Sequence, residues 1–317
     1  MDRVNSILFW HICVMLNIKR AFSDTTFLAV IASLLWASAF AGVKIGLKYH
    51  TPFQFAGVRF MFSGIMLILY FNHIRNYWKE VVRHWRFIAI IALLQTVIQY
   101  MLFYSGVDLL PASIAAMITG SSPLFVSIVA HFSIRDDRMN RMKLFSILMG
   151  VAGVAVISLG RRHLPSGVVI SLLGVSLLLA NNFFSGWANV LISKRGQQIS
   201  PVVLSSSSLF FGGVGLILIS IPFEGYGLKA VAPEYFVSLA WLSFLSAAAF
   251  AIWYTLLQRP GVKVSELNTW KFLIPVAGAI LSWILIPDET PDWISVSGML
   301  VIAASLLVNS YSGRKKL

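Results

Sequence analysis

The chain has 317 residues, of which 58% are apolar and 12% are charged, and its mean hydropathy is +0.80. A soluble domain carries about a quarter of charged residues, and one of this size could not bury so much apolar surface. The composition therefore excludes a soluble enzyme, a nucleic-acid-binding protein and a disordered scaffold. A net charge of +13 then indicates cationic loops beside a membrane, and the single Cys13 excludes an internal disulfide or a cysteine-based metal cluster.

Apolar segments recur along the whole chain. A membrane-spanning helix needs about 20 mainly apolar residues, and its backbone must satisfy its own hydrogen bonds. Ten segments meet this requirement: 26–47, 52–71, 87–107, 111–134, 144–160, 168–192, 201–223, 235–258, 264–286 and 293–312. Each span with its loop takes about 30 residues, which leaves no room for a soluble catalytic domain. The sequence predicts an all-α integral membrane protein with ten transmembrane helices.

Residues 1–25 precede the first span and contain a short apolar run, 7–16. At about ten residues this run is too short to cross a membrane, and Lys19 and Arg20 follow it without a signal-peptide cleavage site. We interpret residues 1–25 as an interfacial segment, or as the product of a start codon placed too early, with Met15 as the true start.

The cations are divided unequally between the two sides of the predicted membrane. The loops that share a side with the N-terminus hold 18 Lys and Arg residues, and the opposite loops hold only 4. Because cytoplasmic loops carry the excess of Lys and Arg, both termini are predicted to be cytoplasmic, which agrees with an even number of spans. We expect the inner (plasma) membrane of a bacterium, because the compact chain carries no targeting sequence.

The two halves of the chain repeat the same spacings. Pro52 opens the second span and Pro201 the seventh, and a serine lies ten residues before a proline in both the fourth and the ninth span. We predict one five-helix repeat at 26–160, a second at 164–313 and a basic tail at 314–317. Since five is an odd number, the repeats must have opposite orientations. Inverted repeats are typical of secondary transporters, which bind their substrate near the middle of the membrane.

Two prolines at matching places, Pro123 and Pro275, are expected to interrupt the fourth and ninth spans and to free backbone carbonyl groups one turn earlier. A harmless kink in each helix is the alternative. A charge within the hydrocarbon costs at least about 3 kcal/mol and faces a cavity or a partner. Lys271 lies one turn before Pro275 and about 12 Å into its span. We interpret it as a contact for a substrate carboxylate or phosphate, as a group that exchanges a proton, or as a structural partner of Glu266 or of carbonyl groups on a neighbouring helix.

Two further cations lie within the predicted spans. Arg59, about 10 Å into the second span, is expected to have a structural or gating role, because its planar guanidinium suits a carboxylate or the carbonyl groups of a helix end. Lys44 is expected to extend its ammonium toward the outer interface. No acidic residue lies deep in a span, so the interior carries net positive charge. This charge favours an anionic or zwitterionic substrate over a cationic one.

Uncharged polar and aromatic residues complete the candidate site. They suit a pocket for a small organic solute, although amides and rings also serve as packing contacts between helices. The candidate substrate-binding residues are Lys271, Asn268, Trp270, Gln95, Gln99, Tyr104, Asn182 and Trp253. The candidates for structural or gating roles are Arg59, Lys44, Trp36, Pro123 and Pro275.

The sequence contains no pattern that is typical of catalysis or nucleotide binding. It has no pair of histidines at helical spacing, no phosphate-binding Gly-rich loop before a lysine and no nucleophile elbow. We therefore expect no catalytic residue, no metal and no cofactor. Transport would then be driven by a gradient or be facilitated, rather than be driven by ATP.

The stretch WASAFAGVKIGLKYHTPFQFAGVRFMFSGIMLILY, residues 36–70, has a Trp in the first span, a Lys near its end, a Pro that opens the second span and an Arg one to two turns later. It resembles the opening of an EamA domain of the drug/metabolite transporter superfamily, and LPASIAAMITGSSPLFVSI, residues 110–128, resembles the fourth span of that family. The resemblance implies two inverted five-helix repeats and a central cavity lined mainly by the first, third, fourth, sixth, eighth and ninth spans. Ile274 departs from the pattern, because many members carry a Glu there.

We predict a secondary transporter that exports a small polar or amphipathic metabolite, such as an amino acid or an organic anion, by alternating access. Its expected partners are this solute, membrane lipid and a coupled proton or exchanged solute, with no nucleic acid and no soluble partner. The alternatives are a translocase of a lipid-linked sugar or lipid and, less favoured, a membrane enzyme or a receptor. The superfamily moves amino acids, sugars, nucleotide sugars, organic phosphates and drugs, and the fold does not choose among them.

Overall fold

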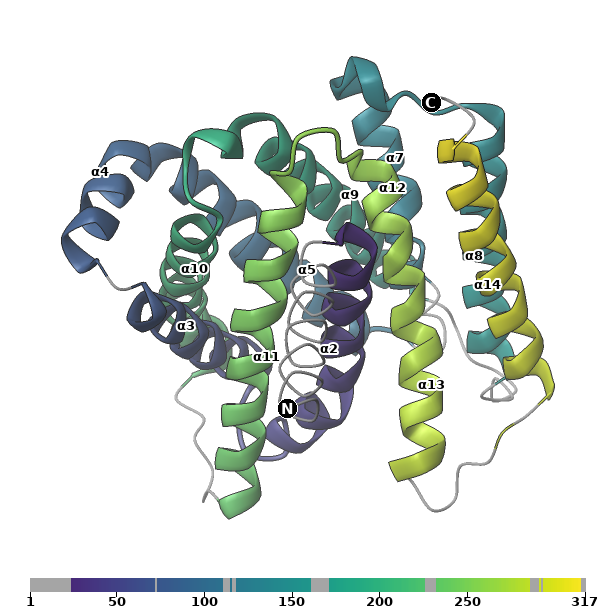
Figure 1. The fold of residues 1–317 in the computed structure, drawn as a ribbon. Coiled ribbons are helices and arrows are strands. Elements are labelled where there is room, and N and C mark those ends of the chain that lie inside the picture. Colours follow the sequence, from purple (N-terminus) through teal and green to yellow (C-terminus); the bar gives the residue numbers. More distant parts are fainter. Residues whose placement is uncertain are drawn as a thin grey trace, which may run out of the picture.

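The computed structural model describes residues 24–71, 73–110, 115, 118–160, 171–225, 232–285, 291 and 293–314. Within these residues the chain is helical and has no strand, and the helices lie side by side in one bundle (Figure 1). The expected interfacial segment, Met15 and the last residues of the basic tail lie outside the described residues.

Ten helical segments in the described part of the chain correspond to the ten expected spans. The elements are α2 (Thr25–Gly46), α3 (Pro52–Tyr70), α4 (Ile74–Ile91), η1 (Ala92–Ile98), α5 (Gln99–Asp108), α7 (Ser122–Ser133), η2 (Arg135–Asp137), α8 (Arg141–Gly160), α9 (Leu172–Arg195), η3 (Gly196–Gln198), α10 (Pro201–Glu224), α11 (Pro233–Leu257), α12 (Val264–Thr269), η4 (Trp270–Phe272), α13 (Leu273–Leu285) and α14 (Trp293–Arg314). The third span consists of the end of α4, η1 and α5, and the ninth consists of α12, η4 and α13.

The length and composition of these helices confirm an all-α membrane protein. Within the described residues, five helices are long and apolar enough to cross a membrane: Pro52–Tyr70, Ile74–Asp108, Leu172–Gln198, Pro201–Glu224 and Pro233–Leu257. Three shorter helices are also apolar: Thr25–Ala39, Ile118–Ser133 and Trp293–Asn309. The chain is therefore a multi-pass membrane protein.

Local sequence explains where several helices begin. Pro52, Pro201 and Pro233 each stand at the first position of a helix, where the missing N–H of proline costs no hydrogen bond. The carboxylate of Asp24 caps α2 by accepting hydrogen bonds from the backbone N–H groups of Thr26 and Phe27. Helix boundaries are thus encoded by local chemistry, even though the interiors of these helices are almost uniformly apolar.

Helices α3 and α10 occupy equivalent places in the two repeats and cross at glycine. A methyl group at Gly57 would lie 2.8 Å from the carbonyl oxygen of Gly213, and one at Gly213 would lie 2.7 Å from the carbonyl oxygen of Gly57. Gly64 makes the same close approach to Ser206. The contacts run from 57 to 64 on one helix and from 213 to 206 on the other, so the helices are antiparallel. Gly57 and Ser206 are 149 residues apart, as are Gly64 and Gly213.

Helices α8 and α14 are a second antiparallel pair with the same property. The hydroxyl of Ser146 donates to the carbonyl oxygen of Ser305, and the hydroxyl of Ser305 donates to that of Ser146, both over 2.8 Å. Gly153 and Gly298 approach each other closely: a methyl group at Gly153 would lie 2.8 Å from the carbonyl oxygen of Gly298, and one at Gly298 would lie 2.7 Å from that of Gly153. Gly298 and Gly153 each lie 152 residues from Ser146 and Ser305, respectively, so the counterparts of one contacting pair form the other pair. A two-fold axis between inverted repeats requires this relation.

The central helices of the two repeats also make equivalent contacts. Helix α2 packs against α11 and α13, and α9, its counterpart in the second repeat, packs against α5 and α7. In Figure 1, α3 and α10 lie on one side of the α2–α11 pair, and α8 and α14 lie on the opposite side of the molecule. The candidate residues on α2, α9, α11 and α12 are therefore brought to the middle of the bundle.

One end of the bundle holds nearly all described loop cations, and we call it the basic end. It contains the ends of α3, α9 and α11 and the starts of α4, α10 and α12. Carboxylates tie these elements together: the partly buried Glu80 of α4 accepts from the backbone N–H of Ser200, and the buried Asp137 accepts from that of Ser265 over 2.9 Å. At the opposite end, Glu224 accepts from the backbone N–H of Phe53 at the start of α3. Each carboxylate lies at the positive end of a helix dipole.

Candidate functional site

Lys271 lies in η4, a single 3-10 turn between α12 and α13. Pro275 lacks the N–H that would donate to the carbonyl group of Lys271 in a regular α-helix. The backbone instead closes a tighter turn, in which the N–H of Leu273 donates to the carbonyl group of Trp270. The expected interruption before Pro275 is present, and a matching one precedes Pro123, because α7 begins at Ser122.

The ammonium of Lys271 lies against two indole rings. Its Nζ is 4.7 Å from the ring centroid of Trp253 and 5.5 Å from that of Trp36, and the two rings pack edge to face at 5.2 Å. Such a contact stabilises a desolvated cation by about 2 kcal/mol. Glu266, the expected structural partner, instead forms an ion pair with Lys263. Among the described residues, no carboxylate lies within ion-pairing distance of Lys271.

The side-chain amides of Asn189 and Asn268 complete this arrangement. We call it the lysine cluster, which consists of Lys271, Trp253, Trp36, Asn268 and Asn189. Trp253 Nε1 donates to Asn189 Oδ1 over 2.8 Å, and Asn268 Nδ2 lies 3.5 Å from the same oxygen. Asn268 Nδ2 also donates to the carbonyl group of Val264. Asn268 is fully buried, and its Oδ1 has no hydrogen-bond donor among the described residues. The cluster therefore presents one cation and one unused acceptor.

A second cation lies in an arginine cluster, formed by Arg59, Phe60, Tyr100 and Tyr104. The guanidinium of Arg59 is 4.4 Å from the ring centroid of Phe60 and 5.4 Å from that of Tyr100. Arg59 is 4% exposed, and its Nε and Nη1 have no acceptor among the described residues. The ring of Tyr104 lies 6.3 Å from that of Tyr100. A buried guanidinium with unused donors is a place where an anionic group can bind.

Aromatic rings connect the two clusters across the repeats. Phe60 of the arginine cluster packs against Phe250 at 6.2 Å, and Phe250 packs against Trp36 of the lysine cluster at 5.7 Å. These rings come from α3, α11 and α2, so the path runs through both repeats. The contacts that connect the two cations are consequently made by aromatic rings.

Gln95 and Gln99 lie together on the third span. Gln95 is within η1, a π-helical segment, and its Nε2 donates to Gln99 Oε1 over 2.9 Å. The Oε1 of Gln95 is buried without a donor among the described residues. A π-helical turn is frequent at functional sites, because it leaves backbone and side-chain groups unpaired.

Asn182 lies at the break before Pro123, away from the contacts of Lys271. Its Nδ2 donates to the carbonyl group of Ile118 over 2.6 Å and lies 3.3 Å from Ser121 Oγ. The amide thus compensates a carbonyl group next to the interrupted helix. Trp270 is partly buried and packs at the edge of the main apolar core.

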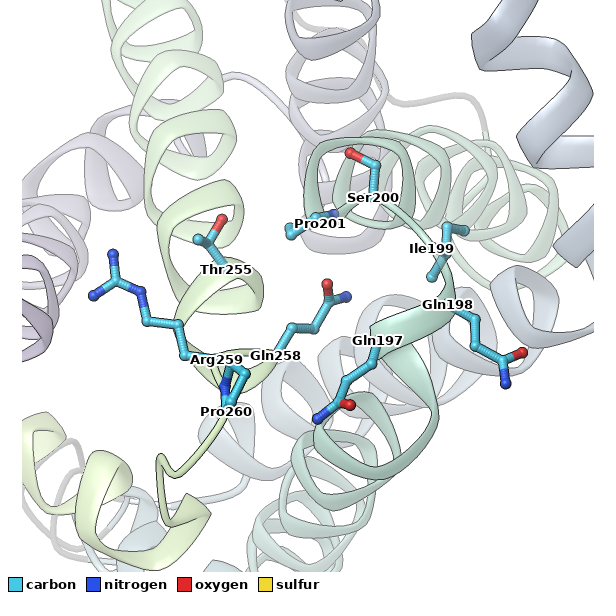
Figure 2. A pocket seen from close by; sticks show the side chains of 9 residues that line it. All are labelled: Gln197, Gln198, Ile199, Ser200, Pro201, Thr255, Gln258, Arg259 and Pro260. Atoms are coloured by element: carbon cyan, nitrogen blue, oxygen red, sulfur yellow. The ribbon is translucent and has the colours of Figure 1, made fainter. Parts of the chain in front are cut away.

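A pocket of about 510 Å³ opens at the basic end, between the end of α9, the start of α10 and the end of α11. Figure 2 shows the side chains that line it, with the amide of Gln258 between η3 and α11. Thr255 lines the pocket and follows Trp253 by two residues. Thr255 therefore lies about 3 Å along the axis of α11 from Trp253 of the lysine cluster.

The sequence matches the model of the EamA-like transporter family over residues 25–159 and again over 172–311. The chain belongs to the EamA-like transporter family. The two matched ranges coincide with the two halves that the helix pairs relate, and most of the chain is covered.

Several EamA-like relatives align with nearly the whole chain. The uncharacterised transporter YvbV of Bacillus subtilis is 25% identical over 293 residues, which cover 92% of this chain and 93% of the relative. A second relative, from Salmonella typhimurium, is named a probable amino-acid metabolite efflux pump. It is 24% identical, and the alignment covers 95% of its length. A crystal structure of a protein with 18% sequence identity superposes with a TM-score of 0.77, over 92% of this chain and 98% of that one.

Within this EamA-like fold, the structure brings together Lys271, Trp253 and Trp36, and it joins Asn268 to them through Asn189. Asn189 itself was not among the site candidates, although it lies seven residues after Asn182 and therefore on the same face of α9. The arginine cluster holds Tyr104 and Arg59. Gln95 and Gln99 form a separate pair, Asn182 and Trp270 lie apart, and the side chain of Lys44 is outside the described part of the structure.

Proposed function

We propose that this chain is a secondary transporter that exports an amino acid or a small organic anion by alternating access of the halves 26–160 and 164–313. The observation that carries this proposal is the ammonium of Lys271, which lies in the ninth span over Trp253 and Trp36. A cation in a membrane span costs free energy and is retained for a ligand or a pathway. Transport, rather than catalysis, is the activity that this arrangement supports.

The chemistry of the lysine cluster favours a zwitterion with a small apolar body. The ammonium of Lys271 would bind the carboxylate, and the free Oδ1 of Asn268 would accept from the amino group of the solute. Indole rings at the same place suit an apolar or aromatic side chain. The names of the relatives from Salmonella typhimurium and Escherichia coli, probable amino-acid metabolite efflux pumps, are consistent with this class of solute.

Arg59 supplies a second place for an anionic group. Its Nε and Nη1 are buried and lack acceptors among the described residues, so a carboxylate could accept from both. Two cations separated by aromatic rings suit a solute with two acidic groups. They also suit a solute whose single carboxylate binds first to one cation and then to the other during transport. In this proposal Arg59 binds the solute, in addition to the structural or gating role that the sequence predicts for it.

The orientation follows from the distribution of charge. We place the basic end, and with it both termini, on the cytoplasmic side of the inner membrane. The pocket beside Thr255 would then admit solute from the cytoplasm, as export requires. A coupled proton or an exchanged solute would supply the driving force, without a soluble partner.

Counterflow in proteoliposomes tests the proposal. The panel contains amino acids, organic acids, sugar phosphates and cationic dyes, and mass spectrometry measures accumulation. We expect selective accumulation of acids or zwitterions. Lys271→Ala should reduce it by about tenfold or more, because a charge-assisted hydrogen bond is lost. Lys194→Ala, at an exposed residue of the basic end, is the matched control and should leave accumulation unchanged.

Other outcomes would overturn parts of the proposal. Accumulation of dyes alone would contradict an anionic or zwitterionic substrate. Unchanged transport by Lys271→Ala would remove Lys271 from the site, and accumulation of no solute would favour a lipid-linked substrate.

A further inference from the structure

Residues 74–86 of α4 carry two parallel stripes of exposed side chains. The basic stripe consists of Arg75, Lys79, Arg83 and Arg86, and the apolar stripe consists of Ile74, Trp78, Val82 and Trp85. Both follow spacings of three and four residues, so each forms one face of the helix. Val82 is 69% exposed and Trp85 is 59% exposed, which is unusual for apolar side chains beside four cations.

The opposite face of α4 is fixed against α10. Tyr77 is buried, and its hydroxyl lies 3.0 Å from Ser206 Oγ and 2.7 Å from Ser207 Oγ. Glu80 accepts a hydrogen bond from the backbone N–H of Ser200. These contacts set the rotation of α4 about its axis, so both stripes must face away from the protein. Figure 1 shows α4 at the outer edge of the bundle.

A hollow of about 400 Å³ lies where the two stripes meet a kink in α4. The backbone departs from helical geometry at His84, and the hollow is lined by the six residues Val82–Phe87. Two of them, Arg83 and Arg86, are cations, and the guanidinium of Arg86 lies 5.5 Å from the ring centroid of Trp85. The hollow therefore combines paired guanidinium groups with an indole ring.

The cations of the stripe are not neutralised within the described structure. The two ion pairs described are Asp137 with Lys143 and Lys263 with Glu266, and the only acid on this part of α4, Glu80, is turned toward α10. Four exposed cations without a described carboxylate partner make this face of α4 strongly electropositive, which attracts anions. Beside an exposed apolar stripe on a membrane protein, an anionic lipid matches both the charge and the apolar surface.

We propose that the outer face of α4 is a binding site for an anionic phospholipid in the leaflet at the basic end. The phosphate lies in the hollow between Arg83 and Arg86, Arg75 and Lys79 contact neighbouring headgroups, and the acyl chains follow the apolar stripe. An amphipathic helix with cations along one face and tryptophans along another binds an anionic membrane surface in this way. Glu80 of α4 accepts a hydrogen bond from the backbone N–H of Ser200, which lines the pocket at the basic end, so the lipid-binding helix contacts the wall of that pocket.

The test measures lipid binding to the delipidated full chain and is independent of transport. Native mass spectrometry compares the retention of phosphatidylglycerol with that of phosphatidylcholine, and thermal unfolding follows the addition of each lipid. We expect phosphatidylglycerol to be retained preferentially and to raise the unfolding temperature. The double variant Arg83→Gln/Arg86→Gln should weaken the apparent affinity by about tenfold, because two cations near an anionic surface are removed.

The matched control is Arg138→Gln/Arg141→Gln, which removes two exposed arginines from the same end of the bundle. It should retain the preference for phosphatidylglycerol. Equal retention of both lipids, or an equal loss of preference in both double variants, would overturn the site. Stabilisation of the same size by inorganic phosphate would also overturn it, because the ligand would then be a free anion and not a lipid.

Discussion

The indole Nε1 of Trp253 donates a hydrogen bond of 2.8 Å to Oδ1 of Asn189, which joins α11 to α9 in the interior of the bundle. Both side chains are at most 2% exposed. The bond fixes the plane of the ring on which Lys271 lies. The position of the cation thus depends on a neutral residue of another helix.

Asn189→Leu should lower the free energy of unfolding by about 1–3 kcal/mol, because the buried indole N–H then lacks an acceptor. Trp253→Phe removes the donor. The double variant should be less destabilised than the sum of the two single variants, since neither unpaired group remains. Thermal unfolding of the purified protein in detergent measures all three, and strictly additive effects would contradict the coupling.

Arg59→Met should raise the unfolding temperature in the absence of solute, because it removes a buried cation with unused donors and keeps the apolar volume. Replacement of buried charges by apolar residues gains about 1–4 kcal/mol in favourable cases. The same variant should lose the stabilisation that carboxylate solutes confer on the wild type. Arg195→Met, at an exposed position, is the control for both measurements. Retained stabilisation by carboxylates in Arg59→Met would show that they do not bind there.

Lys143→Met should be strongly destabilising. Lys143 and Asp137 form an ion pair of 2.5 Å in which both side chains are at most 5% exposed, and loss of one partner leaves a buried charge that costs about 3–5 kcal/mol. The same substitution at Lys263, whose pair with Glu266 is 30% and 34% exposed, should cost less than about 1 kcal/mol. A similar decrease in unfolding temperature for both variants would be inconsistent with this difference in burial.

Gly213→Ala should separate α3 from α10. The added methyl group would lie 2.6 Å from the backbone nitrogen of Met61 and 2.7 Å from the carbonyl oxygen of Gly57, and backbone atoms cannot move aside as a side chain can. A loss of about 1–3 kcal/mol is expected from such overpacking. Gly215→Ala on the same helix meets only Val97 Cγ2, at 3.2 Å, and should be tolerated. Differential scanning fluorimetry of the two variants distinguishes a local clash from a general effect of alanine.

His50 should make the stability pH-dependent. Burial lowers the pKa of His50 below its ordinary value of 6.5, although the carboxylate of Glu224 opposes this shift. The unfolded chain then binds more protons than the folded one, so the contribution of His50 to stability is lost as the pH falls below 6.5 toward the lowered pKa. The unfolding temperature of wild type should decrease more between pH 7 and pH 5 than that of His50→Gln. Parallel pH profiles would contradict the shift.

Much of the architecture could be predicted from the sequence, because apolar length defines a span and proline marks a break. The interruption at Pro275 and the positions of the helix-opening prolines follow from the missing N–H, and this chemistry is local. Pro52 and Pro201 also indicated the inverted repeat. Lys271 was recognisable because a charge in an apolar span is costly wherever its partners lie.

The contacts within the site could not be predicted in the same way. Helices that face lipid on one side and protein on the other are apolar all round, so the sequence does not specify which face is turned inward. Asn189 therefore looked no different from Asn182, although only Asn189 accepts from Trp253. The π-helical segment around Gln95, against which α10 packs, also has no signal in the local sequence.

The reciprocal contacts of α8 with α14, and of α3 with α10, bear on the ancestry of the chain. In each pair of helices, the counterparts of two contacting residues also contact each other, so two copies of a single five-helix half, inserted in opposite orientations, would make the same contacts with each other. A gene duplication followed by fusion would have required no new interface. Only the cations in the loops had to diverge, so that each half kept a single orientation in the membrane.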